Sequence, residues 1–162
     1  MKINTSILTG WRIASKTRPI KAKPLINLLV DRTVTSKFLV DTLEGKEPLG
    51  DGVVICVGEA GDTWQQMPAK LLKKYQVVAI DKDGWMDCNP LPDNAVDVIE
   101  VPESQTDIGG FYIIGQWGET VGNEKNVQRG VAGDFICRSQ TDHTDVWVVR
   151  RKLFLNTYNI KS

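Results

Sequence analysis

Hydrophobic residues in this chain occur in short runs separated by turn-forming residues, a pattern that predicts β-strands more often than helices. Residues 53–57 are a β-branched apolar run of the kind that suits a buried strand. Glycine and acidic residues within 59–62 predict a hairpin turn, with residues 63–67 as the returning strand. Pro68 is tolerated at the first position of a helix, so it predicts the start of a short one. Residues 76–80 follow as a further strand.

The same order of elements is predicted near the C-terminus. Gly133 and Asp134 form a turn ahead of a strand at 135–138. A polar turn then leads to a strand at 146–150 and a short helix at 152–158. Each predicted helix is too short to be stable without tertiary packing.

Segments 50–77 and 133–160 also align with each other without a gap. The identical pairs are Gly50/Gly133, Asp51/Asp134, Asp62/Asp145, Trp64/Trp147, Leu72/Leu155 and Tyr75/Tyr158. Tryptophan and tyrosine are rare in this chain, so chance is a poor explanation for the match. The alignment predicts an internal repeat whose two copies superpose.

The remaining segments give weaker patterns. Further strands are predicted at 34–43, 96–101 and 111–116, and a polar loop at 118–130. Two prolines within residues 18–24 predict a strand at the edge of a sheet, because proline cannot donate a ladder hydrogen bond. Residues 1–17 have no sustained period and predict an irregular arm or an edge strand.

These elements indicate an α+β protein rich in antiparallel sheet, built from two similar strand–turn–strand–short helix units. We expect an N-terminal arm at residues 1–17, a first αβ repeat at 18–90 and a second at 91–162. The two repeats either form separate domains or share one core.

Composition favours an ordinary globular protein. The 162 residues are 41% hydrophobic, with 20 basic and 20 acidic side chains. The longest apolar runs are far too short to cross a bilayer, and the N-terminus lacks the apolar region of a signal peptide. A cytoplasmic location is therefore expected, with no membrane partner.

Basic charge is concentrated at the start of the chain. Residues 1–40 contain eight Lys or Arg and a single acid, whereas residues 41–110 contain five Lys and fourteen acids. One interpretation is nucleic-acid binding, with Trp11 available for stacking. Its candidate residues are Arg12, Lys16, Arg18, Lys21 and Lys23. The alternative is intramolecular complementarity or a solvated face.

Aromatic residues fall into two groups. Trp64 and Trp147, inside the repeat, are expected to pack where each short helix crosses its hairpin. Three further tryptophans lie outside the repeat and beside glycines, which makes them candidates for an exposed ligand-binding surface. They are Trp11, Trp85 and Trp117.

Motifs that carry catalysis or bind cofactors are absent from the sequence. His143 is the only histidine, so one chain cannot assemble a Ser-His-Asp triad or a histidine-rich zinc site. Cys56 and Cys137 lie in apolar runs and are expected in the core, and Cys88 forms no CxxC pair with either. No cofactor and no metal site are predicted, and an enzyme is disfavoured.

The C-terminal unit resembles small bacterial and phage proteins named for a Pro-Gly-Asp-Tyr-Gly motif. The resemblance is carried by Ala132-Gly133-Asp134-Phe135-Ile136, Trp147-Val148-Val149 and Lys152-Leu153-Phe154-Leu155-Asn156-Thr157-Tyr158. A weaker match runs from Thr42-Leu43-Glu44-Gly45 through Gly50-Asp51 to Trp64 and Tyr75. Ala132 replaces the motif's proline and Phe135 its tyrosine. The resemblance implies a phage- or prophage-associated protein and supplies no active-site residues.

Three functions are therefore considered. The favoured one is a non-enzymatic module that binds a ligand, a protein partner or a second copy of the chain. Nucleic-acid binding through the basic N-terminal segment is the second. A small nucleotide or small-molecule enzyme is the third, without a motif behind it.

Overall fold

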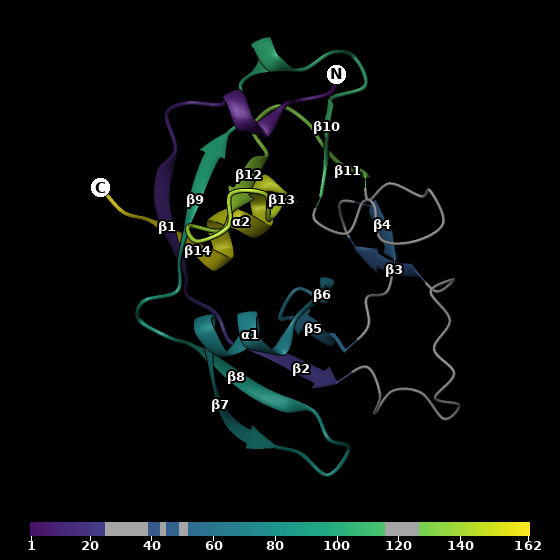
Figure 1. Cartoon of the computed structure of the whole chain (residues 1–162), viewed down its shortest axis with the longest axis vertical. Helices are drawn as coiled ribbons and strands as arrows, with labels where there is room; N and C mark the ends of the chain where they lie inside the picture. The colour runs from purple at the N-terminus through teal and green to yellow at the C-terminus, as the bar shows by residue number, and fades with distance from the viewer. Residues whose placement is uncertain (25–38, 43–44, 49–51, 116–126) are drawn as a thin grey trace.

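Two five-stranded antiparallel sheets make up most of the protein, one above the other in Figure 1. The computed structural model describes residues 1–24, 39–42, 45–48, 52–115 and 127–162, with backbone alone at 39–42 and 45–48. The architecture is α+β with two short helices, as the sequence predicts.

The first sheet has the strand order β6-β5-β2-β8-β7. Its strands are β2 (Ile20–Pro24), β5 (Val54–Gly58), β6 (Thr63–Gln66), β7 (Tyr75–Ile80) and β8 (Met86–Pro90). Helix α1 (Pro68–Lys74) connects β6 to β7 and has Pro68 at its first position. Proline has no backbone N–H to donate, but the N–H groups of the first helical turn have no partner within the helix, so proline is tolerated at this position.

The second sheet repeats this arrangement in the order β13-β12-β9-β1-β14. Its strands are β1 (Arg12–Lys16), β9 (Ala95–Glu100), β12 (Phe135–Arg138), β13 (Val146–Val149) and β14 (Tyr158–Ile160). Helix α2 (Arg151–Thr157) connects β13 to β14. The two sheets with their helices form the first and second unit, and they agree strand by strand in order and direction.

One strand of the second unit comes from the other end of the chain. In the first unit β7 turns back into β8, which lies between β7 and β2. The corresponding place in the second unit, between β14 and β9, is filled by the N-terminal strand β1. Matching backbone bonds mark the equivalence: Leu91 donates to the Lys74 carbonyl at 2.8 Å and Thr17 to the Thr157 carbonyl at 2.9 Å. The chain therefore passes between the units twice, from β1 to β2 and from β8 to β9.

This arrangement corrects two expectations. Residues 12–16 are an internal strand, where an irregular arm or an edge strand was expected. Strand β2 is the central strand of its sheet, although its prolines predicted an edge. The physical reason is placement: Pro19 precedes the strand and Pro24 is its last residue, so the prolines leave the ladder between them intact.

The ungapped alignment holds only after the hairpin turn. Cys56 pairs with Trp64 across β5 and β6, and Cys137 pairs with Trp147 across β12 and β13. The turn of the second unit is therefore two residues longer, which makes Gly52 the structural partner of Gly133. Both glycines have positive φ, 70° and 89°. Gly50 and Asp51, the partners expected from sequence, lie outside the described residues.

Equivalent residues form the core of each unit. In the first unit these are Ile20, Ala22, Val54, Cys56, Leu71, Tyr75 and Cys88. In the second they are Val96, Val98, Phe135, Cys137, Phe154, Tyr158 and Ala14, together with Val149. Cys56 and Cys137 are buried at matching positions, which confirms their prediction as core residues. In the second unit the rings of Phe135, Phe154 and Tyr158 stack on one another.

Two smaller hairpins complete the described fold. They are β3 (Leu39–Thr42) with β4 (Gly45–Pro48), and β10 (Phe111–Ile114) with β11 (Val127–Gly130). Short 3-10 turns occur at Thr5–Ile7 and Glu103–Gln105. Residues 127–130 are thus a strand, where a polar loop was expected. The described part of the chain holds no helix with the length and apolar character needed to span a bilayer.

Candidate functional site

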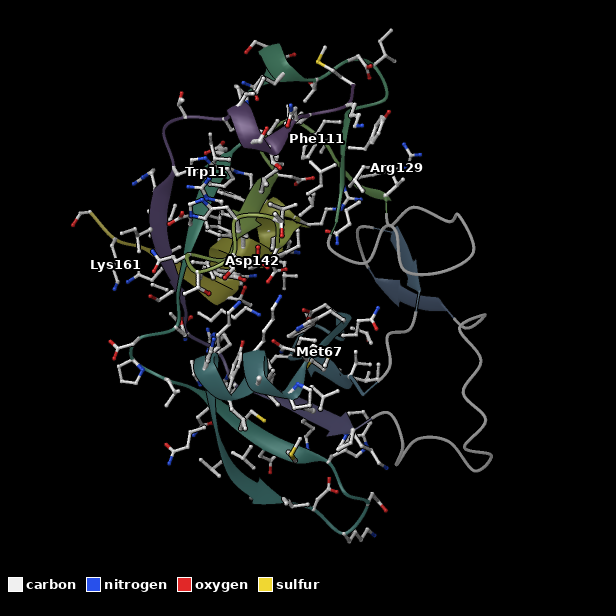
Figure 2. All side chains as sticks on the ribbon, viewed as in Figure 1. Trp11, Met67, Phe111, Arg129, Asp142 and Lys161 are labelled. Atoms are coloured by element: carbon white, nitrogen blue, oxygen red, sulfur yellow. The ribbon has the colours of Figure 1, made fainter. Side chains whose placement is uncertain are left out.

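A cavity of about 140 Å³ lies between the two units. Its walls come from β6 and α1 of the first unit, from β13 and α2 of the second, and from the β1–β2 connection that joins the units. In Figure 2 Met67, just before α1, and Asp142, in the turn before β13, mark the facing ends of the two units. An engineered cavity of about 150 Å³ holds benzene, so this one suits a ligand of about one ring.

Two pairs of equivalent aromatic residues frame the cavity. Trp64 and Trp147 occupy matching positions on β6 and β13 and are half-buried. Tyr75 and Tyr158 begin β7 and β14 and are buried, with 1% and 8% of their surface exposed. The expectation that the tryptophans pack beneath the helices thus holds in part, because both also line the cavity.

Each tryptophan is covered by a lysine from the other unit. The Nζ of Lys16, on β1 of the second sheet, lies 4.4 Å from the centroid of the Trp64 ring. The Nζ of Lys74, at the end of α1, lies 4.7 Å from the centroid of the Trp147 ring. Both distances are within the range of cation–π attraction. These contacts link the units through the cavity.

Lys16 is held between the units. Its Nζ lies 5.6 Å from the ring centroids of both Tyr75 and Tyr158, in addition to Trp64. Its backbone N–H donates to Asn94 Oδ1 at 2.7 Å and its carbonyl accepts from Asn94 Nδ2 at 3.0 Å. Burial lowers the pKa of Lys16, and electrostatic interactions with Cys56, Asp62 and Cys137 oppose this shift only in part.

Lys74 is perturbed in the same direction. Burial, followed by the positive charge of Lys16, lowers its pKa to about 8. Among the residues that the structure describes, neither Lys16 nor Lys74 has an ion-pair partner. Two neighbouring lysines, each partly desolvated, thus meet in one cavity.

The aromatic frame is shared by both units, but the cations are not. Lys70 and Lys74 on α1 occupy the positions that Leu153 and Thr157 occupy on α2, and all four line the cavity. Lys70 also forms an ion pair with Asp145 of the second unit. On the α1 side Lys74 is thus the lysine without an ion pair in the described structure, whereas α2 places Leu153 and Thr157 at the cavity.

Two buried oxygens near the cavity are unsatisfied within the described structure. They are Oδ1 of Asp62 and the hydroxyl of Tyr75. Asp62 packs closely on Gly58, where an added Cβ would lie 2.2 Å from Asp62 Oδ1. Burial raises the pKa of Tyr75 and that of Tyr158, so both hydroxyls stay protonated. Such orphaned groups in native proteins call for a specific explanation, of which a bound ligand is one.

The tryptophans predicted as ligand-binding residues lie elsewhere. Trp11 is half-buried, donates its indole N–H to the Leu8 carbonyl at 2.9 Å and lies under Arg138. Trp85 lies in the β7–β8 turn, at the end of the molecule opposite Trp11 (Figures 1 and 2). Trp117 is outside the described residues. The structure does not bring the two described tryptophans together.

The basic residues predicted to bind nucleic acid are also divided. Lys16 points into the cavity, and Arg18 lines it while donating to the Asn156 carbonyl at 3.3 Å. The Nζ of Lys21 lies 3.3 Å from Asp87 Oδ1 and 3.8 Å from Asp81 Oδ2. The Nζ of Lys23 lies over the Trp85 ring. Arg12 is exposed on β1. Nucleic-acid binding through this set stays a prediction.

Sequence reasoning missed Lys70 and Lys74, because only the fold brings α1 opposite the second unit. The available signal was their position: each lies in the repeat where the other copy has an uncharged residue. The described residues hold no cluster of three or more His, Cys, Asp or Glu side chains able to bind a metal ion. Comparison of the chain with protein families, with curated proteins and with solved structures gives no match.

Proposed function

We propose that this protein binds a small planar anion, of the aromatic carboxylate or phosphate class, in the cavity between its two units. The observation that carries the proposal is the neighbouring pair Lys16 and Lys74, partly desolvated and without an ion-pair partner in the described structure. Buried charges in proteins are normally paired or compensated by a bound ion. An anion bound at Lys74 supplies the missing charge.

The walls of the cavity favour a ring as the second part of the ligand. Trp64 and Trp147 present aromatic surface from opposite units. A flat ligand can stack on such surface, and ligand pockets are typically apolar with a few placed polar groups. The distribution of charge sets the orientation: the anionic group faces Lys74 on α1, and the ring faces Leu153 on α2.

The proposal also covers the origin of the two units. We infer that the chain arose by duplication of one strand–turn–strand–helix unit, with the ligand site formed where the copies meet. Equivalent residues in the two cores and the matching strand orders support this origin. The resemblance to the Pro-Gly-Asp-Tyr-Gly proteins favours a small cytoplasmic, phage- or prophage-associated binding protein. No catalytic step is required by the proposed function.

Titration of the intrinsic tryptophan fluorescence with 4-methylbenzoate tests the proposal. This probe has one ring, one carboxylate and no reactive group. Saturable quenching with a Kd on the order of 100 μM is expected for a ligand of this size. The neutral amide, 4-methylbenzamide, is the matched control for charge and should bind at least about tenfold more weakly.

Adjacent lysines on α1 provide a matched pair of variants. Lys74→Gln removes the amine over Trp147 and should weaken binding of 4-methylbenzoate about tenfold, which corresponds to about 1.4 kcal/mol. Lys73→Gln removes an exposed amine one residue away and should leave the Kd unchanged. Equal Kd values for both variants, or no saturable quenching by the wild-type protein, would contradict an anion site in this cavity.

A further inference from the structure

We propose that Lys16 captures carbonyl compounds, its Nζ forming an imine with an aldehyde or ketone group carried by the planar anion that the cavity binds. This inference rests on the proposed function for the ligand and adds a covalent step to it. It assigns Lys16 and Lys74 different tasks: Lys74 binds the anionic group and Lys16 reacts with the carbonyl.

Position is the first argument. The Nζ of Lys16 is surrounded by three aromatic rings, at 4.4 Å from Trp64 and 5.6 Å from Tyr75 and Tyr158. Two hydrogen bonds with Asn94, one accepted and one donated by its side chain, fix the backbone from which this side chain extends. A ring held in the cavity beside Trp64 brings its substituent close to this amine.

The protonation state of Lys16 is the second argument. Only an uncharged amine attacks a carbonyl, and lysines become nucleophilic when they are desolvated or placed beside another cation. Lys16 meets the first condition, because burial lowers its pKa, and Lys74 lines the same cavity. The groups that act on Lys16 or line its surroundings are Asp62, Cys56, Cys137, Lys74, Tyr75 and Tyr158.

The reaction needs no oxidant or reductant. The lone pair of Nζ forms a C–N bond to the carbonyl carbon, the carbonyl π electrons move to oxygen, and a proton passes from nitrogen to that oxygen. The resulting carbinolamine loses its hydroxyl group as water, taking the second nitrogen proton, and C=N replaces C=O.

Reductive trapping with 4-formylbenzoate tests the inference. This probe is 4-methylbenzoate with an aldehyde in place of the methyl group. The protein is incubated with it below stoichiometry, borohydride reduces any imine to a stable amine, and peptide mass spectrometry locates the label. Lys16 should carry several times more label than exposed Lys73, since the cavity holds the aldehyde beside Lys16 and a lowered pKa raises its uncharged fraction.

Controls separate this inference from the proposed function. Excess 4-methylbenzoate should prevent labelling of Lys16, and Lys16→Arg, which keeps the charge, should lose the adduct. Saturable binding of 4-methylbenzoate together with label on Lys74 in place of Lys16, or spread evenly over exposed lysines, would overturn the imine at Lys16 and leave the binding function standing. Absence of 4-methylbenzoate binding would overturn the binding function itself. Peptide mapping of the wild-type protein gives the answer even where Lys16→Arg does not fold.

Discussion

Asn94 and Lys16 are joined by two hydrogen bonds, one in each direction, between the side-chain amide of Asn94 and the backbone of Lys16. Lys16 ends β1, just before the chain crosses to the first sheet, and Asn94 lies directly before β9, at the end of the crossing back to the second sheet. Asn94 is 2% exposed. This contact therefore fastens the two crossings to each other and fixes the base of the Lys16 side chain.

Replacing Asn94 by alanine should lower the free energy of unfolding by about 2–3 kcal/mol, because a buried backbone N–H and carbonyl lose their partners. Urea denaturation measures the change. Asn89→Ala, at an exposed position on β8, should change stability by less than about 0.5 kcal/mol. Similar values for the two variants would show that the Asn94 contact contributes little.

The pKa of Lys74 predicts a specific dependence of stability on pH. The folded protein releases this proton near pH 8, whereas the unfolded chain keeps it up to its ordinary value of 10.5. Between these values the unfolded state binds more protons, so Lys74 makes the free energy of unfolding rise with pH, by at most about 1.4 kcal/mol per pH unit. Below pH 8 the charge is retained in both states and its burial destabilises the fold.

Lys74→Met should remove the contribution of Lys74 to the pH dependence of stability. The variant is expected to gain stability relative to wild type near neutral pH and to lose that advantage progressively between pH 8 and 10.5. Cys56, whose pKa burial raises to about 12, titrates alike in both proteins and cancels in the comparison. Parallel stability curves for the two proteins across this range would refute the assigned shift.

The unpartnered hydroxyl of Tyr75 should be dispensable for folding. Its oxygen is buried and has no hydrogen bond within the described structure, so Tyr75→Phe removes a desolvated polar group without breaking a contact. The free energy of unfolding is expected to stay the same or to increase by about 1 kcal/mol. Weaker binding of 4-methylbenzoate by this variant, with stability retained, would assign the hydroxyl to the ligand. A loss of stability beyond about 1 kcal/mol would show that the Tyr75 hydroxyl has a hydrogen-bond partner in the folded protein.

Strand β1 is predicted to be essential to the second unit. Ala14 at its centre is fully buried, and the strand pairs with both β9 and β14. Deletion of residues 1–17 should abolish cooperative unfolding of the second sheet. Circular dichroism measures the unfolding transition, and hydrogen exchange measures protection at β9, β12 and β14. A synthetic peptide of residues 1–17 should restore it. Undiminished protection of β14 after the deletion would be incompatible with the observed strand order.

Local elements could be predicted from sequence because their causes are local. The β-branched run that became β5 and the proline that begins α1 act on their own neighbours. The place of β1 could not be predicted, since it depends on pairing Ala14 with Ile160, far away in the chain. The longer turn after Ser139 also escaped the ungapped alignment, because turn length changes without altering the strand pattern.

The candidate site was hidden for the same reason. Lys16 was predicted to contact phosphate as part of a basic segment, a prediction that used its charge and its neighbours in sequence. In the structure its environment is set by Trp64 and Tyr158, which only the assembled units place around it. Charge and residue type can be read from sequence, whereas desolvation depends on packing.

The central claim, a ligand site between the two units, is tested most directly by the indole N–H signals of the tryptophans in a ¹H–¹⁵N spectrum. Titration with 4-methylbenzoate should shift the signals of Trp64 and Trp147 together, with one common Kd, because one ligand contacts both units. The signals of Trp11 and Trp85 should stay in place. Saturable shifts confined to Trp11 or Trp85, or a spectrum unchanged at saturating probe, would contradict the account.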